Sequence, residues 1–230
     1  MTWPSRARAD ARADAQTDEE ESYRVLRSRI DLSRLPKHSR DVTERVIYAT
    51  ADFDYATDLV CDEEGLAAAV AALAAGAPVV VDDVTVAAGI SGSPVFCKVG
   101  EPLARRLART AGIPVAAAAV RLAFGEAGPG GVWVVGCAPA ALAEILSRGV
   151  ESAFVIGMPV GFVGAAEVKD ALRASPIRSV SNVSEKGGAA AAVAAFDALL
   201  RPAVAVSGSR AGWGRGAAAA APPPGNVSAR

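Results

Sequence analysis

Three glycines between an apolar segment and a helix-forming segment give the clearest chemical signal in this sequence. Gly157, Gly161 and Gly164 lie in the stretch IGMPVGFVGAAEVKDAL, which begins at Ile156. Glycine has no Cβ, so its backbone can approach a ligand closely, and the unpaired N–H groups at a helix start favour an anion. The spacing matches neither a dinucleotide fingerprint nor a P-loop. The stretch predicts either an anion or carboxylate site, or a tight turn that lets strand and helix pack.

Other side chains with reactive or metal-binding chemistry are few and scattered. The cysteines Cys61, Cys97 and Cys137 form no Cys-x-x-Cys pair, which argues against a disulfide framework and a structural zinc site. We interpret them as small buried hydrophobic side chains in a reducing compartment. Asp52 and Asp54 are two spaced acids with no third kind of ligand beside them. We therefore expect solvated carboxylates there and no bound metal.

Composition restricts the class of protein. The chain has 230 residues, of which 51% are hydrophobic, and a formal net charge of −1, which suits one globular domain. Basic residues form no cluster, so nothing indicates binding of nucleic acid. The N-terminus has no apolar core like that of a signal peptide, and no window of about 18 apolar residues is free of charge, glycine or proline. We expect a cytoplasmic protein with neither membrane nor nucleic acid as a partner.

The two ends of the chain differ in composition from its middle. Residues 1–21 alternate Arg, Ala and Asp and then become acidic, which predicts a disordered tail. Residues 203–230 are rich in Ala, Pro and Gly and predict a second tail. The folded domain is then expected to span residues 22–202.

Within that domain, short apolar segments alternate with segments of helical periodicity. Strands that are each followed by a helix indicate a parallel sheet covered on both faces. The pattern therefore predicts an α/β fold, a single three-layer αβα domain with a mostly parallel central sheet of undetermined strand order. Expected strands cover residues 77–83, 131–139, 152–159 and 177–182; expected helices cover residues 22–30, 39–52, 63–76, 101–112, 114–125, 141–149, 165–174 and 189–200.

Several segments resemble one known family. The stretch GMPVGFVGAAEVKDAL, from Gly157, strongly resembles the signature of the precorrin-8X methylmutase family of cobalamin biosynthesis. The segments SYRVLRSRIDLSRLP, TERVIYATADFDYATDLV, AGAPVVVDDVTVAAGI, VVGCAPAALAEIL and SNVSEKGGAAAAVAA resemble further parts of the family. The resemblance covers nearly all of residues 22–202.

This resemblance implies an isomerase that acts on precorrin-8X or cobalt-precorrin-8. Family members move a methyl group between adjacent ring carbons of this corrin precursor and yield hydrogenobyrinic acid or its cobalt-containing counterpart. The shift needs no added cofactor, and a histidine is thought to protonate the ring system. Arginines and helix N-termini would hold the carboxylates of the substrate. The resemblance also implies a homodimer.

The chain departs from the family pattern at the catalytic position. Tyr48 stands where family members have histidine, and the only histidine, His38, lies ten residues earlier. A phenol has an unperturbed pKa of about 10 and an imidazole of about 6.5, so histidine is the better matched proton donor near neutral pH. We therefore keep open a second hypothesis, an impaired paralogue that binds a corrinoid or related tetrapyrrole, and a third, an isomerase of a less anionic substrate.

Possible carboxylate anchors are also replaced. Pro114 and Val115 stand where the family usually has Thr-Arg, and residues 182–185 read Asn-Val-Ser-Glu where it tends to have Asn-Arg-Gly-Arg. With these departures, the resemblance assigns Tyr48 to the proton-donor position. The residues it implies for substrate binding are Ser22, Arg27, Gly157, Met158, Pro159, Gly161, Gly164, Lys186, Gly187 and Gly188.

Overall fold

A six-stranded sheet forms the centre of the molecule, and its strand order is β1-β6-β5-β4-β2-β3. The computed structural model describes residues 5–208. All neighbouring strands run parallel except β1, which pairs antiparallel with β6. The expected mostly parallel α/β sheet is confirmed. Its strands are β1 (Leu59–Cys61), β2 (Val79–Val81), β3 (Val95–Cys97), β4 (Gly131–Val135), β5 (Ser152–Gly157) and β6 (Ser179–Asn182).

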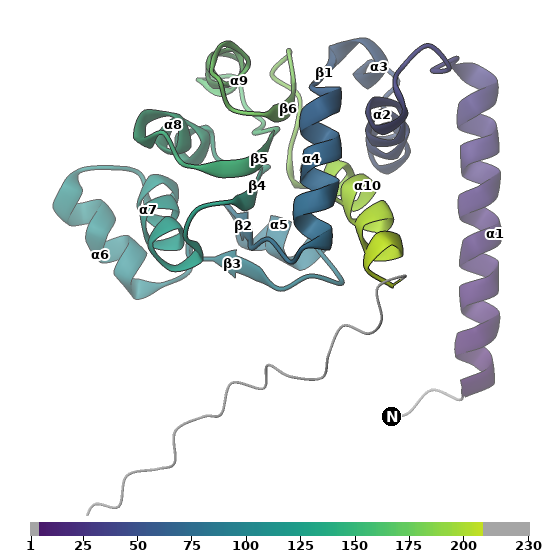
Figure 1. Cartoon of the computed structure of the whole chain (residues 1–230), viewed down its shortest axis with the longest axis horizontal. Coiled ribbons are helices and arrows are strands. Elements are labelled where there is room, and N and C mark those ends of the chain that lie inside the picture. Colours follow the sequence, from purple (N-terminus) through teal and green to yellow (C-terminus); the bar gives the residue numbers. More distant parts are fainter. Residues whose placement is uncertain (1–4, 209–230) are drawn as a thin grey trace, which may run out of the picture.

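Helices cover both faces of this sheet (Figure 1). The helices α2, α4 and α10 pack together on one face, and α7, α8 and α9 pack on the other, with α6 outside α7. The helices are α1 (Ser5–Arg29), α2 (Lys37–Thr50), α3 (Tyr55–Asp58), α4 (Glu63–Ala74), α5 (Val84–Gly89), α6 (Pro102–Ala111), α7 (Val115–Ala127), α8 (Pro139–Arg148), α9 (Ala165–Ala174) and α10 (Ala189–Gly208).

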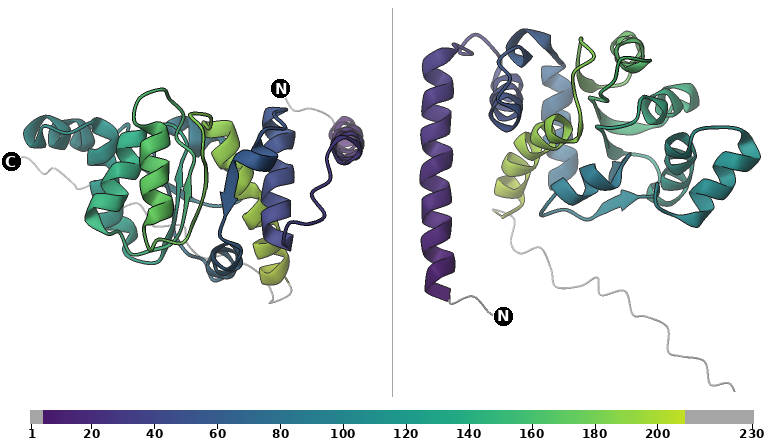
Figure 2. Two further views of the ribbon diagram at one scale, coloured as in Figure 1. Left: turned by 90° about the horizontal axis from the view of Figure 1, so that it is seen from above. Right: turned by 180° about the vertical axis from the view of Figure 1, so that it is seen from behind.

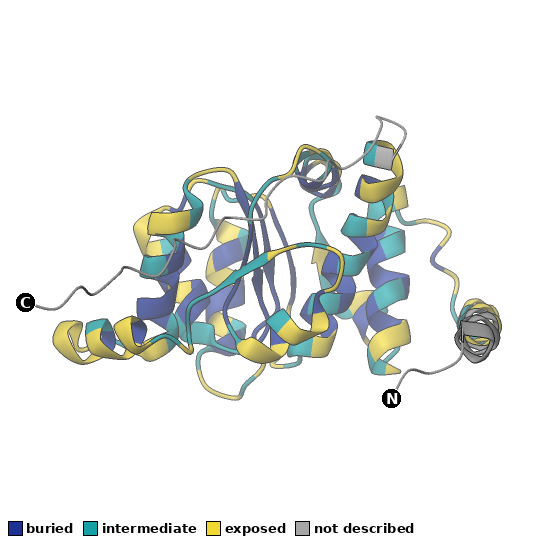
Figure 3. Cartoon of the chain, turned by 90° about the horizontal axis from the view of Figure 1, so that it is seen from below, coloured by how far each residue is buried: buried dark blue, intermediate teal, exposed yellow. Residues whose placement is uncertain are grey.

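The apolar strand sequences follow from this three-layer packing. Side chains along a strand point alternately to the two faces. In β4, Val132 and Val134 belong to the core formed with α4 and α10, whereas Trp133 and Val135 belong to the core formed with α7, α8 and α9. Both faces are covered, so every residue of β4 is buried. The strands at the centre of the molecule are accordingly dark blue in Figure 3. A continuous apolar run, rather than an alternating one, is the expected signature of such a strand.

Both chain ends differ from the sequence prediction. Helix α1 already begins at Ser5, so the expected irregular tail is helical from that residue on. Alanine and arginine are strong helix formers, which favours this conformation. Helix α1 stands apart from the three layers beside α2 (Figure 2), and its buried Leu26 joins the main core. At the other end α10 continues through Pro202 to Gly208, and residues 209–230 of the second expected tail lie outside the described residues.

Four short elements were not predicted from the sequence. These are the three-residue strands β1 and β3 and the short helices α3 and α5. Strands β1 and β3 form the two edges of the sheet, where only one neighbour pairs with each. None of their residues is fully buried, so burial leaves little apolar pattern in these two sequences.

Helix α10 is long and apolar enough, by composition alone, to cross a membrane. In the fold it packs against α2 and α4, and Phe196 and Leu199 are fully buried there. The apolar sequence of α10 is therefore accounted for by its contacts in the core.

Two phenylalanines of the β5 region provide a test of this packing. Phe154 on β5 has no exposed surface, whereas 95% of Phe162 is exposed. We expect Phe154→Ala to lower the free energy of unfolding by about 3–5 kcal/mol, because it leaves a cavity in the main core. Phe162→Ala, measured at a protein concentration where the chain is monomeric, should change it by less than about 0.5 kcal/mol. Urea denaturation followed by circular dichroism measures both, and equal losses would contradict the assigned core.

Candidate functional site

Two loops rich in glycine lie side by side at the carboxyl edge of the sheet. The first, residues 158–164, joins β5 to α9, and the second, residues 183–188, joins β6 to α10. We call them the glycine loops. Strands β5 and β6 are parallel neighbours, so the loops leave the same edge. The Gly161 N–H donates to the Glu185 carbonyl at 3.1 Å, and the Gly188 N–H donates to the Met158 carbonyl at 2.9 Å. Ligands of open α/β sheets bind at this edge.

Gly187 makes this contact between the loops possible. A Cβ on Gly187 would lie 2.3 Å from the Met158 carbonyl oxygen, and its φ of 144° also favours glycine. Gly188 has a φ of 108°. The paired glycines predicted for the closing loop therefore have a steric reason that does not depend on a ligand.

The glycine that opens the first loop is a packing residue. Gly157 is buried at the end of β5, where a Cβ would lie 2.5 Å from Leu172 and 3.1 Å from Leu142. Met158 and Pro159 are buried too, and the Met158 N–H donates to the Val135 carbonyl at 2.9 Å. The tight-turn interpretation accounts for these three residues. Direct contact between them and a ligand stays a prediction.

The exposed part of the first loop is apolar at its tip and polar at the start of α9. Phe162 and Val163 are 95% and 88% exposed. Gly164 is the N-cap of α9 with a φ of 78°, and its carbonyl accepts the first helical hydrogen bond, from Val168. The N–H groups of residues 165–167 therefore have no partner within the helix. These N–H groups, which directly follow the segment from Gly161 to Gly164, are the part of the loop region that suits an anion.

Asp58, at the end of α3, orders the second glycine loop and was missed in the sequence analysis. Its carboxylate accepts hydrogen bonds from the N–H groups of Val183 and Ser184 at 3.1 and 2.8 Å. It also accepts from the Ser184 hydroxyl at 2.7 Å and the Asn182 amide at 3.0 Å. Burial raises the pKa of Asp58, but the bonds from Ser184 and Asn182 outweigh it and lower the pKa overall. No local sequence pattern links Asp58 to residues 182–184, so only the fold reveals this site.

Lys186 ties the second glycine loop to the segment that follows α2. Its ammonium lies 2.7 Å from Asp52 and 2.5 Å from Asp54. The hydrogen bond from Lys186 lowers the pKa of Asp52, and the bonds to Asp52 and Asp54 raise the pKa of Lys186. The two acids are thus partners of a lysine. Lys186 can meet a substrate carboxylate only in competition with them.

Tyr48 lies in the last turn of α2 and lines a cavity between α2 and α1. The cavity measures about 340 Å³, and Ser22 and Phe53 also line it. The Tyr48 ring is 37% exposed and stacks on Tyr23, with centroids 4.9 Å apart and planes at 10°. The Arg45 guanidinium lies 5.3 Å from the Tyr48 ring centroid. The structure thus brings the predicted Ser22 and Tyr48 together.

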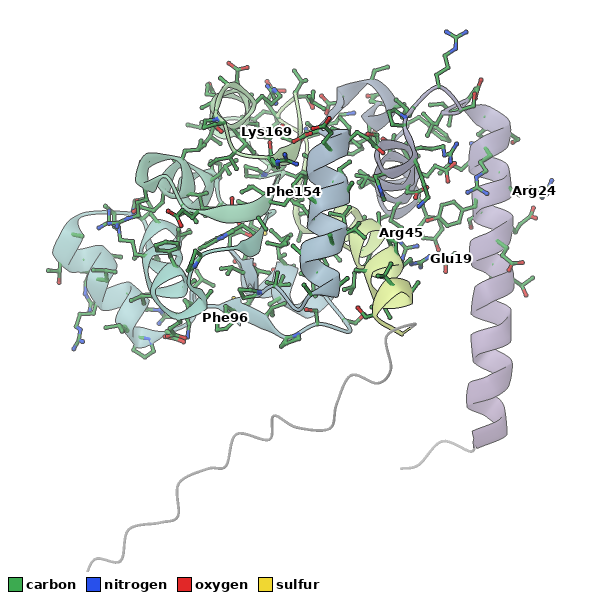
Figure 4. The ribbon with its side chains drawn as sticks, in the orientation of Figure 1. Glu19, Arg24, Arg45, Phe96, Phe154 and Lys169 are labelled. Atoms are coloured by element: carbon green, nitrogen blue, oxygen red, sulfur yellow. The ribbon has the colours of Figure 1, made fainter. Side chains whose placement is uncertain are left out.

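Arg27 is already engaged by an acid. Its guanidinium forms a bidentate ion pair with Glu44, with N–O distances of 3.0 and 2.7 Å, across the contact between α1 and α2. In the same contact Arg45 pairs with Glu19 at 2.6 Å (Figure 4). A substrate carboxylate would have to displace Glu44 to reach the Arg27 guanidinium. Binding of substrate by Arg27 stays a prediction.

His38 and Tyr48 are at opposite ends of α2. Ten residues of helix separate them by about 15 Å along the axis. The His38 N–H donates to Glu63 at the start of α4, at 3.0 Å. The position of His38 therefore agrees with the interpretation that it does not replace the family histidine.

Comparison with known proteins assigns this arrangement to a family. The family model described as precorrin-8X methylmutase matches residues 19–202. The chain belongs to the precorrin-8X methylmutase family. A precorrin-8X methylmutase of Sinorhizobium sp. is 36% identical over 197 residues, which cover 80% of this chain and 92% of that protein.

Two further relatives agree with the assignment to the precorrin-8X methylmutase family. A cobalt-precorrin-8 methylmutase of Salmonella typhimurium is 34% identical and covers 80% of this chain and 94% of its own. The solved structure of a precorrin-8X methylmutase from Thermus thermophilus superposes with a TM-score of 0.76 at 32% identity, over 84% of this chain and 98% of that one. The resemblance stated from the sequence is confirmed, and so is the fold it implied.

Gly187 provides a test of the contact between the glycine loops. We expect Gly187→Ala to lower the free energy of unfolding by about 1–3 kcal/mol beyond any backbone strain, because the new Cβ meets the Met158 carbonyl. Gly112→Ala is the matched control, since Gly112 also has a positive φ, 64°, but nothing within 4 Å of a Cβ. Its cost should be about 1–2 kcal/mol. Equal losses in urea denaturation would show that the loop contact does not require glycine.

Proposed function

We propose that this protein is an isomerase of cobalamin biosynthesis that converts precorrin-8X or cobalt-precorrin-8 into hydrogenobyrinic acid or its cobalt counterpart by intramolecular methyl migration. The observation that carries the proposal is the family match over residues 19–202. The glycine loops support it, because their position at the carboxyl edge of the sheet suits a ligand with many carboxylates. The reaction needs no added cofactor.

The proposed site divides substrate binding and proton transfer between two regions. The first turn of α9, which follows the cap residue Gly164, offers main-chain N–H groups to substrate carboxylates, and Gly161 leaves the loop beside it free of a side chain. Ser22 and Tyr48 line the cavity beside α1, and the Tyr48 hydroxyl donates the proton that family members take from histidine. Lys186, held by Asp52 and Asp54 on the segment after α2, connects the two regions.

We propose that the protein acts as a homodimer in the cytoplasm. Phe162 and Val163 form an apolar tip that solvent surrounds in the single chain. Exposed apolar groups of this size at the edge of a site favour burial against a second surface. A second subunit, or the macrocycle held between two subunits, would provide that surface.

Turnover by Tyr48 variants tests the proposed proton donor. We expect the wild-type protein to convert precorrin-8X and Tyr48→Phe to lose at least about 100-fold in kcat, because the ring remains but the hydroxyl is gone. Tyr48→His should restore or exceed wild-type kcat. Tyr23→Phe is the matched control, since it removes a hydroxyl from the same ring stack. Its kcat should stay within about threefold of the wild-type value.

The absorbance change of the corrinoid follows this reaction directly. Tight binding of precorrin-8X without conversion by the wild type would support the alternative of a corrinoid-binding paralogue instead. Absence of both binding and conversion would contradict both functions.

Light scattering coupled to size-exclusion chromatography tests the proposed dimer. We expect the wild type to elute with twice the mass of one chain and Phe162→Asp to elute mostly as a monomer, because a charge replaces the apolar tip. Val204→Asp is the control, since Val204 is an exposed valine near the C-terminal end of α10, and the glycine loops lie at the other end of that helix. A monomeric wild type would contradict the proposal.

A further inference from the structure

Lys169 on α9 is a lysine with no exposed surface. Its ammonium donates to the Asn182 side-chain oxygen at 3.0 Å, to the Lys186 carbonyl at 2.7 Å and closely to the Ser184 carbonyl. An ammonium has three N–H donors, so these acceptors match it one for one. Figure 4 shows Lys169 between α9 and the chain that leaves β6. None of the three acceptors carries a formal charge, so the buried cation is held by dipoles.

These acceptors all belong to the end of β6 and the second glycine loop. Two are main-chain carbonyls of that loop, and the third is on Asn182, whose amide nitrogen donates to the Lys186 carbonyl at 2.8 Å. The hydrogen bonds Gly161–Glu185 and Gly188–Met158 then connect the second loop to the first. The Lys169 ammonium therefore holds the second glycine loop directly, and it holds the first glycine loop through the hydrogen bonds between the two loops.

The buried charge comes at a cost in free energy. Burial lowers the pKa of Lys169 to about 8, while the charges of Asp58 and Glu185 oppose this shift and Arg173 adds to it. An apolar side chain at this position would avoid the cost of burying a charge, but it would leave these three oxygens without their donor. The cation is therefore explained by the conformation that it imposes on its acceptors.

We propose that Lys169 is a positioning residue: its ammonium holds the two glycine loops in the conformation that receives the carboxylates of the substrate, without itself touching the substrate. The identity of that substrate rests on the proposed function, but the action on the loops does not. Lys169 acts through the carbonyls of Ser184 and Lys186 and through Asn182.

Arg173 provides a matched control on the same helix. It is also a cation, and it donates to the Ser181 hydroxyl at 3.1 Å and to the Asn182 carbonyl at 2.9 Å. Its hydrogen-bond partners among the described residues are thus Ser181 and Asn182 of β6 and, at 3.4 Å, Asp170 of α9, rather than residues of the second loop. Lys169→Met and Arg173→Met each remove one cation from α9, but only the first releases the loop carbonyls.

Hydrogen exchange of the free protein, read by mass spectrometry, tests the action on the loops. We expect Lys169→Met to speed amide exchange at least about tenfold in residues 160–164 and 183–188, because the freed carbonyls gain water only when the loops open. Exchange in β4 and β5 should change much less. Arg173→Met should leave both loops within about twofold of the wild type. Unchanged loops in Lys169→Met, or equal acceleration of loops and strands, would overturn the proposal.

Steady-state kinetics with precorrin-8X test the consequence for substrate. We expect Lys169→Met to raise KM at least about tenfold with a smaller change in kcat, since loops that must be ordered on binding weaken affinity. Arg173→Met should leave KM within about twofold. An unchanged KM in Lys169→Met would overturn the positioning role. If the wild type shows no turnover, the proposed function fails, whereas the exchange measurement still decides the action on the loops.

The pH dependence of unfolding checks the buried ammonium independently and covers the case in which Lys169→Met does not fold. The folded pKa of about 8 lies below the ordinary value of an exposed lysine, about 10.4, so the unfolded chain binds more protons between these values. Because of Lys169, the free energy of unfolding of the wild type should increase as the pH rises from about 8 to about 10. Lys169→Met, or Lys169→Gln if the first variant is insoluble, should lack this rise. A parallel pH dependence in variant and wild type would contradict a buried cation and overturn the proposal.

Discussion

The hydrogen bonds between the two glycine loops are the contact on which the candidate site depends. They form because β5 and β6 are parallel neighbours, so that both chains leave the sheet at one edge and remain adjacent. Gly187 lets the second loop approach the Met158 carbonyl more closely than any other residue could. The start of α9, the Lys186 side chain and the first turn of α10 are then positioned together, because they are attached to these two loops.

A polar network of opposite charges supports this contact from two sides. The carboxylate of Asp58 binds the N–H groups of Val183 and Ser184, whereas the ammonium of Lys169 binds the carbonyls of the same loop. Asn182 lies between the two charges and contacts both. Donors and acceptors of one short loop are therefore satisfied by side chains from α3 and α9. This division lets an irregular segment keep one conformation although it has no regular secondary structure.

The sequence alone predicted those parts of the site whose residues are close together along the chain. Strand β5, the glycines after it and helix α9 are consecutive, and the strongest part of the family resemblance lies in the same stretch from Gly157. The partners of the loops were not predictable in this way, because Asp58 and Asn182 are separated by 124 residues and meet only in the folded chain. Nothing in the sequence around Lys169 predicts that its side chain is buried. Its burial depends on how α9 lies against β6, which helical periodicity does not reveal.

The reversed edge strand has a topological consequence for this arrangement. In a wholly parallel sheet, a segment that enters a strand lies at the edge opposite the ligand site. Because β1 runs against β6, Leu59 pairs with Asn182, and the chain enters β1 at the same edge where β6 ends. Because this strand of three residues is inverted, α3 and the end of α2 lie beside the glycine loops. The site edge of the sheet therefore receives two kinds of segment. The glycine loops follow the parallel strands β5 and β6, and α3 precedes the antiparallel strand β1.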